Sequence, residues 1–286
     1  MRPARPSALL LASLSLLACA QAPLRTAADY RARVAELRDE APPGFLAVAA
    51  PPFVVVGDGP VEVVRAEAHD TVAWAVRLLR ADFFAREPED LITIWLFDGE
   101  TSYLHHANAL FGDIPPSPYG YYSSWHDALI INAASGRGTI VHEIVHPFIA
   151  ADFPGCPPWM DEGLASLFEQ PAERDGRLVG RTNWRLPGLQ LAIERGRLPS
   201  FEELLEMSGS EFREEETAGR NYAQARYLLH YLQERDLLRG FYRRFRAARH
   251  RDPSGIETLR ATLGERDLTG FQKRWERYVL GLSFPE

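Results

Sequence analysis

Two histidines four residues apart constrain this 286-residue chain more than any other feature of its sequence. They flank a glutamate in the segment His142-Glu143-Ile144-Val145-His146. On an α-helix, residues four apart lie on one face, so His142 and His146 can hold the same metal ion. Glu143 lies one step round the helix, where it can reach a water on that metal without being a ligand. The pattern predicts a zinc-binding helix, and an ordinary buried helix with two hydrogen-bonded histidines is the alternative.

A catalytic zinc needs a third protein ligand and an open position. Asp152 stands six residues after His146, where a third ligand could follow a sharp turn of the chain. The turn would fall at Ile149, and a β-branched residue does not readily adopt a left-handed conformation. We therefore interpret Asp152 as a carboxylate at the end of the helix.

Glu162 is the better placed candidate for the third ligand. Residues 153–158, which read FPGCPP, break the first helix and allow a second one to begin near Trp159. The two helices can then pack face to face, and Gly163 and Ala165 would let them approach closely. We expect Glu162 to complete the metal site.

These two helical segments resemble a known family. Residues 159–169 read WMDEGLASLFE, which is similar to the ligand helix W-L-N-E-G-F-A-x-Y-x-E of the aminopeptidase-N-like enzymes. With the histidine motif, the segment resembles the gluzincins, the HExxH + Glu zinc metallopeptidases that also include thermolysin. The resemblance implies a peptidase-MA-like enzyme with one Zn²⁺ per chain, bound by His142, His146 and Glu162. It also implies that Glu143 is the general base that activates the zinc-bound water.

One position departs from the gluzincin pattern. Four residues after the glutamate ligand, thermolysin-like enzymes carry an aspartate that orients a ligand histidine, and this chain has Ser166 there. Metal-bound histidines usually donate their other ring N–H to a carboxylate or carbonyl. Asp161 and Glu169 are the candidates for that role.

A tyrosine further along the chain belongs to a second, weaker match. Residues 221–232 read NYAQARYLLHYL and resemble the Y-x-K-G-A-x-V-L-x-M-L helix of aminopeptidase-N-like enzymes, without its Lys-Gly-Ala. In that family the tyrosine hydroxyl donates a hydrogen bond to the tetrahedral oxyanion. The resemblance implies that Tyr222 is catalytic, and a packing tyrosine is the alternative. Because no exopeptidase motif such as GxMEN is present, we expect an endopeptidase.

The first nineteen residues have the pattern of an export signal. Arg2 and Arg5 precede an apolar run over residues 9–18, which is too short to span a membrane as a mature helix. Residues 16–19, Leu-Leu-Ala-Cys, resemble a bacterial lipobox, in which Cys19 would be lipidated. We expect an exported protein anchored to the bacterial cell envelope at Cys19. A signal that is cleaved to give a soluble secreted or periplasmic protein is the alternative.

Composition restricts the partners that such a body can have. With 46% hydrophobic and 25% charged residues, the chain can form one large core or two tightly joined subdomains. Its net charge is −7 and no basic stripe is interleaved with aromatics, which argues against nucleic acid as a partner. If Cys19 is acylated, Cys156 has no disulfide partner, so we expect packing and metal to hold the fold.

The order of elements predicts an α+β, zincin-like fold. We expect a tether and one helix over residues 20–50. A metallopeptidase domain follows over 51–286, with a sheet and active-site helix (51–170) and a helical half (171–286). A small mixed or antiparallel sheet should pack on the HExxH helix. We expect strands at 53–56, 91–97, 119–125 and 128–132, and C-terminal helices at 186–195, 200–207, 218–235, 237–249 and 270–282.

Three segments have alternative interpretations. In gluzincins an edge strand before the HExxH helix pairs with extended substrate, so residues 128–132 are either that edge strand or an interior strand. The charge run over residues 211–216 is expected to be a solvated loop or helix end. The arginines of residues 239–251 should form a solvated face, and contact with anionic lipid near the tether is the alternative.

The expected function is zinc-dependent hydrolysis of peptide bonds in a peptide or protein substrate, with membrane contact only through the lipid anchor. One alternative is a non-catalytic envelope lipoprotein whose structural or vestigial zinc site accompanies partner binding through the cleft. Another is a zinc hydrolase that acts on a non-peptide amide such as cell-wall material. An intact Glu143 beside three ligands favours the enzyme, because a structural zinc site usually closes with a fourth ligand. The sequence carries no signal for an oligomeric state.

Overall fold

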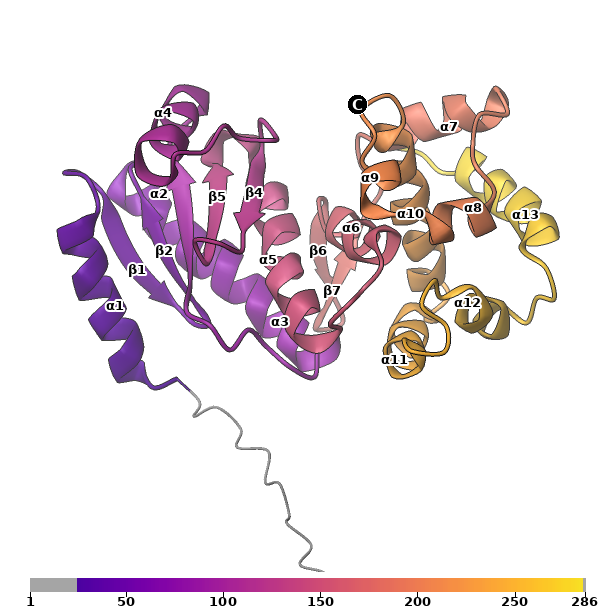
Figure 1. Cartoon of the computed structure of the whole chain (residues 1–286), viewed down its shortest axis with the longest axis horizontal. Helices are drawn as coiled ribbons and strands as arrows, with labels where there is room; N and C mark the ends of the chain where they lie inside the picture. The colour runs from indigo at the N-terminus through magenta and orange to yellow at the C-terminus, as the bar shows by residue number, and fades with distance from the viewer. Residues whose placement is uncertain (1–24, 285–286) are drawn as a thin grey trace, which may run out of the picture.

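The chain forms a half built on a sheet and a helical half, which lie side by side (Figure 1). The computed structural model describes residues 25–284, so the expected export signal and Cys19 lie outside the described residues. The predicted α+β class is confirmed, with a five-stranded mixed sheet followed by a mainly helical C-terminal half. No helix within residues 25–284 combines the length and apolarity that crossing a bilayer requires.

The sheet has the strand order β1-β2-β3-β5-β4. Its three inner strands β2, β3 and β5 run parallel, and the outer strands β1 and β4 are antiparallel to their neighbours. All residues of the inner strands are buried, as expected when both faces of a sheet are covered. The bounds are β1 Leu46–Ala50, β2 Phe53–Gly57, β3 Ile92–Phe97, β4 Gly120–Ser123 and β5 Ala128–Asn132.

Alternate residues of each inner strand enter two separate cores. Val54 and Val56 point to one face, where α1 (Ala27–Glu40) and α4 (Glu100–Phe111) cover them. Val55 points to the other face, which packs against α2 (Val61–Ala66), a π-helical segment (Glu67–Ala73), α3 (Trp74–Asp82) and α5 (Arg137–Asp152). The period of two along each strand thus places the histidine-bearing helix α5 on one face of the sheet.

Of the two interpretations of residues 128–132, the interior strand is confirmed. This segment, β5, is hydrogen-bonded to β3 on one side and to β4 on the other, so it is interior. The edge beside α5 is β4, whose free side is not paired with another described strand. Strand β4 pairs antiparallel with β5 and lies outside it in the sheet. This order could not be predicted, because it depends on contacts between segments that are distant in the sequence.

Residues 25–50 also differ from the expected tether and helix. The helix is present as α1, but residues 46–50 form β1, which pairs with β2 across Pro51 and Pro52. This pairing makes both elements part of the sheet half, so the folded body begins before residue 51. The prolines at the turn obscured the strand because they interrupt its apolar run.

The chain then passes through a second helix and a hairpin into the helical half. Helix α6 spans Pro158–Leu167, and β6 (Pro171–Arg174) pairs with β7 (Arg177–Gly180) in a hairpin that the sequence did not predict. The remaining helices are α7 Leu186–Glu194, α8 Phe201–Glu206, α9 Gly209–Phe212, α10 Ala218–Gln233, α11 Leu238–Ala248, α12 Ile256–Leu263 and α13 Leu268–Leu280.

Helix α6 packs closely against α10. A Cβ at Gly163 would lie 3.1 Å from Cβ of Ala225 and 3.2 Å from Cδ1 of Leu229, both on α10. Gly163 therefore serves the contact between α6 and α10, and the expectation that it would serve the contact between α5 and α6 is wrong. The helical half thus contacts α6 through α10.

Candidate metal centre

Helices α5 and α6 bring two histidines and a glutamate together. Nε2 of His142 lies 3.7 Å and Nε2 of His146 lies 3.8 Å from Oε2 of Glu162. One ligand atom from each residue lies within 4.8 Å of the others. The helix break at residues 153–158 reverses the chain so that the two helices face each other, as their sequences predicted.

Each histidine has a carboxylate at its other ring nitrogen. Nδ1 of His146 contacts Oδ1 of Asp161 at 2.9 Å, and Nδ1 of His142 lies 3.5 Å from Oε1 of Glu169. Such contacts fix the tautomer of a histidine and leave its Nε2 for a metal. Asp161 is therefore hydrogen-bonded to one histidine, and Glu169 lies beside the other without a direct hydrogen bond to its Nδ1.

Glu169 is itself firmly held. Arg185 donates from Nε to Oε2 at 2.8 Å and from Nη2 to Oε1 at 2.6 Å, and Asn183 donates to Oε2 at 2.8 Å. Burial alone would raise the pKa of Glu169, but the bonds from Arg185 and the nearby His142 outweigh it and lower that pKa to about 2. A Cβ at Gly138 would overlap the carbonyl oxygen of Glu169, so this glycine lets the first turn of α5 approach the Glu169 backbone.

Negative charge is concentrated in this cluster. Burial alone would lower the pKa of His146, but Asp161 and then Glu162 outweigh it and raise that pKa to about 10. Glu143 is 6% exposed, and burial raises the pKa of its carboxyl against the opposing effect of the two histidines. A cation placed between the histidines would therefore meet favourable charge from several carboxylates.

Asp152, the other candidate ligand, lies outside the cluster. It is the last residue of α5, and its side chain is buried among donors from four residues. Oδ1 accepts the backbone N–H groups of Ala85 and Arg86 at 3.2 and 3.0 Å and a bond from Arg246, and Oδ2 accepts the Tyr242 hydroxyl at 3.0 Å. Arg246, whose side chain is 27% exposed, is thus paired with a buried carboxylate, and the expectation of a solvated face is wrong for this arginine.

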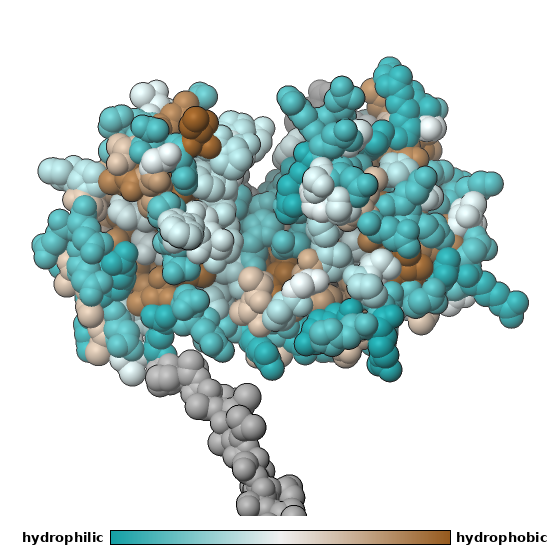
Figure 2. Space-filling view, viewed as in Figure 1, coloured by the Kyte–Doolittle hydropathy of each residue, from teal (hydrophilic) through white to brown (hydrophobic). Residues whose placement is uncertain are grey.

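A groove of about 1390 Å³ runs past the cluster between the two halves. Figure 2 shows the surface hollowed at this junction. Residues 119–122, which include strand β4, line the sheet side. The other side is lined by Trp184, Arg185 and the start of α10, including Tyr222. Burial and then the charge of Glu162 raise the pKa of Tyr222, so its hydroxyl stays protonated near the cluster.

Arg213, which was not predicted from the sequence, contacts Glu162, the expected third metal ligand. Its Nε and Nη2 donate to Oε1 of Glu162 at 3.1 and 2.9 Å. Arg213 follows the one-turn helix α9, which begins with a capping box at Ser208 and Glu211 and buries Phe212. The charge run at 211–216 is therefore a loop and helix end as expected, but one of its side chains turns back into the groove. The only local signal was a lone arginine among acidic residues.

Arg226, also missed, supports the end of α6. Its Nε donates to the carbonyl of Ser166 at 2.8 Å, and its Nη2 donates to the carbonyl of Leu167 at 3.3 Å. Carbonyls at a helix C-terminus have no partner within the helix, and Arg226 supplies one from α10 although its side chain is fully buried. Helix α6 is thus fixed at its end as well as along its face.

One family model matches the part of the chain that carries the cluster, and its description names no activity. The model of a family described as "Protein of unknown function (DUF1570)" matches residues 137–254, which is less than half of the chain. The match begins with α5 and includes His142, Glu143, His146, Glu162 and Tyr222. No curated protein matches the sequence.

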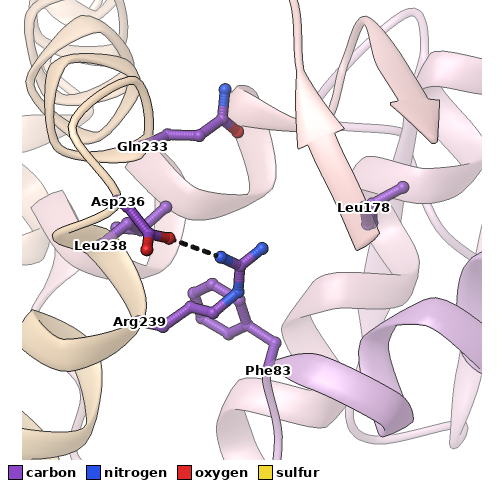
Figure 3. A pocket seen from close by; sticks show the side chains of 6 residues that line it. All are labelled: Phe83, Leu178, Gln233, Asp236, Leu238 and Arg239. Carbon is purple, nitrogen blue, oxygen red and sulfur yellow. Dashed lines mark hydrogen bonds and ion pairs between the residues drawn. The ribbon is translucent and has the colours of Figure 1, made fainter. Parts of the chain in front are cut away.

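A second pocket lies where α3, β7 and α11 meet (Figure 3). Its volume is about 10 Å³, which is close to the least that one water needs. At its lining, Nη1 of Arg239 donates to Oδ1 of Asp236 at 3.2 Å. The groove at the metal cluster is therefore the better candidate for a functional site.

Proposed function

We propose that this protein is a zinc metallopeptidase of the gluzincin type. The observation that carries the proposal is the convergence of His142, His146 and Glu162 within 4.8 Å, with Glu143 facing the same groove. Two imidazoles and one carboxylate are a donor set that catalytic zinc uses, with a fourth position left for a reactant. The DUF1570 match spans these residues but assigns no activity.

The separations between donor atoms fit a shared ion. Zinc–nitrogen and zinc–oxygen distances near 2.1 Å place two ligands of a tetrahedral site about 3.4 Å apart. The distances of 3.7 and 3.8 Å from Oε2 of Glu162 to the two histidines are close to this value. They are too long for direct hydrogen bonds. Two of the three separations thus approach those of a ligand set, and all three donor atoms lie within 4.8 Å of one another.

The residues around the cluster have distinct roles in the proposed reaction. Bound zinc would supply a Lewis acid that polarises a peptide carbonyl and activates water. Glu143 would accept the proton of the attacking water and pass it to the leaving amine, and its raised pKa suits both steps. Tyr222 would donate a hydrogen bond to the oxyanion, which its protonated hydroxyl can do.

The groove favours a peptide over a small molecule as substrate. Its volume of about 1390 Å³ exceeds the roughly 300–1,000 Å³ of small-ligand pockets. The free edge of β4 lies along it, where an extended peptide could add a strand. The proposal includes cleavage within a chain, and a location at the cell envelope through lipidated Cys19.

The test is Glu143→Gln in the soluble fragment that begins after Cys19. We expect the variant to bind one zinc per chain and to cleave a peptide library at least about 100-fold more slowly, since general base catalysis contributes 10²–10⁴-fold. Glu194→Gln, on the exposed surface of α7, is the matched control. Unchanged cleavage by the zinc-loaded Glu143 variant would rule out the mechanism. A zinc-loaded parent that cleaves no peptide would favour the partner-binding alternative.

A further inference from the structure

The two carboxylate oxygens of Glu162 have different surroundings. Oε2 faces the histidines at 3.7 and 3.8 Å, whereas Oε1 accepts both hydrogen bonds from Arg213. The side chain of Glu162 is 8% exposed and that of Arg213 is 48% exposed, so the arginine reaches the carboxylate from the solvent side of the groove. One oxygen of Glu162 thus accepts hydrogen bonds from Arg213, and the other faces the two histidines.

The position of Arg213 is set by its own short helix. The α9 capping box and buried Phe212 fix the backbone, and Nη1 of Arg213 contacts the carbonyl of Gly209 at 3.4 Å. The planar guanidinium directs two donors at one oxygen, an arrangement that a single ammonium group cannot reproduce. The contact is therefore directional as well as electrostatic.

We propose that Arg213 is a positioning residue that limits Glu162 to one metal-binding oxygen. This inference rests on the proposed function. By holding Oε1, Arg213 keeps the protein donor atoms at three, two nitrogens and one oxygen, and preserves an open position for substrate. Without Arg213, Glu162 can turn both oxygens toward the ion, which then has four protein donor atoms and, with a bound water, a higher coordination number than in the parent.

This role predicts a result that differs from ordinary support of a ligand. Loss of an outer hydrogen-bond partner usually lowers metal affinity 10- to 100-fold. In contrast, Arg213→Gln is expected to keep zinc affinity within about threefold of the parent or to increase it, because a second oxygen replaces the lost support. Hydrolysis should still fall by at least about 10-fold, because the added oxygen crowds the position that substrate needs.

The experiment uses Co²⁺ as the probe in the parent, Arg213→Gln and Arg213→Lys. Visible absorption of bound Co²⁺ weakens as its coordination number rises, so we expect weaker bands in the glutamine variant. Arg213→Lys keeps the charge but cannot direct two bonds from a planar group, so it should also show weaker bands. Arg174→Gln is the matched control, because Arg174 is 52% exposed, binds Glu234 through two donors and lies outside the groove.

The outcomes separate this inference from the proposed function. Weaker bands with retained zinc affinity in both variants, and parental behaviour of Arg174→Gln, support the inference. Parental bands in Arg213→Gln overturn it, whether or not zinc affinity falls, while the metallopeptidase proposal stands. A lysine variant with parental bands also overturns it, because charge alone would then suffice. A parent that binds neither Co²⁺ nor Zn²⁺ overturns the proposed function and the inference together.

Discussion

Asp152 and Glu162 are both buried carboxylates paired with an arginine, yet their remaining contacts are opposite in kind. Asp152, at the end of α5, receives donors from four residues and its side chain has no exposed surface. Glu162, on α6, gives one oxygen to Arg213 and presents the other to two histidine nitrogens beyond hydrogen-bond distance. The first carboxylate is satisfied by the fold, and the second is satisfied only in part.

The difference separates a structural carboxylate from a candidate ligand. Buried polar groups in native proteins are almost always hydrogen-bonded, so each incomplete one needs an explanation. For Asp152 none is needed, because its donors tie the loop after α3 and helix α11 to α5. Oε2 of Glu162 instead opens on the groove, where the proposed metal would be its partner. The comparison therefore predicts that loss of Asp152 affects folding and loss of Glu162 affects metal binding.

The largest expected effect is on stability, at Asp152. Asp152→Asn keeps the shape of the side chain but removes the charge of a fully buried carboxylate and leaves the Arg246 guanidinium, whose side chain is 27% exposed, without its counter-charge. Breaking a buried ion pair from one side typically costs about 3–5 kcal/mol. We expect the free energy of unfolding of the metal-free protein to fall by about 3 kcal/mol, measured by urea denaturation at pH 8. Zinc stoichiometry of the folded variant should remain one per chain.

The reverse pattern is expected for Glu162→Gln. Its zinc affinity should fall by at least about 100-fold, since a direct ligand matters more than the outer contacts whose loss costs 10- to 100-fold. Its metal-free unfolding free energy should change by less than about 1 kcal/mol, because the partner Arg213 is half-exposed. Equilibrium dialysis and urea denaturation on the same samples measure both. If Asp152→Asn loses zinc and Glu162→Gln loses stability, the assignment of the two carboxylates is the wrong way round.

Sequence predicted the parts of this site that depend on local spacing. His142, Glu143 and His146 lie within two turns of one helix, and a proline-rich break placed Glu162 opposite them. Arg213 could not be predicted because it lies 51 residues from Glu162, and only packing of α9 brings the two together. The same limit explains why β5 was taken as a possible edge strand, since the order of strands depends on contacts between distant segments.

Elements were predictable where turn residues bound them and were missed where they were short. The helix that ends before residues 41–44, Ala-Pro-Pro-Gly, was predicted, whereas the four-residue strands β6 and β7 gave no clear pattern. Gly163 illustrates a different limit. A glycine at this position indicated a close contact between helices, but the partner helix, α10, could only be identified from the packed structure.

The comparison of the two carboxylates is best made near pH 8, because buried His230 adds a pH dependence of its own. His230, on α10, contacts the hydroxyl of Tyr278 through Nδ1 at 2.9 Å. Burial, and then the charge of Arg226, lower the pKa of His230 to about 4, with Glu234 opposing and Arg174 adding to the effect. An unfolded histidine has a pKa near 6.5, so below that pH the unfolded chain binds the proton more readily.

The contribution of neutral His230 to the free energy of unfolding should therefore be fully present above pH 6.5 and should decrease as pH falls from 6.5 toward 4. At pH 5 the expected loss attributable to His230 is about 2 kcal/mol in the free energy of unfolding. His230→Asn removes the titrating group, so its urea-denaturation curve should lose that much less between pH 8 and pH 5 than the metal-free parent. His69→Asn, at an exposed position, is the matched control and should retain the parental pH dependence. An equal loss in the parent and in His230→Asn would mean that acid acts through other groups, and the groove cluster would then be the first place to look.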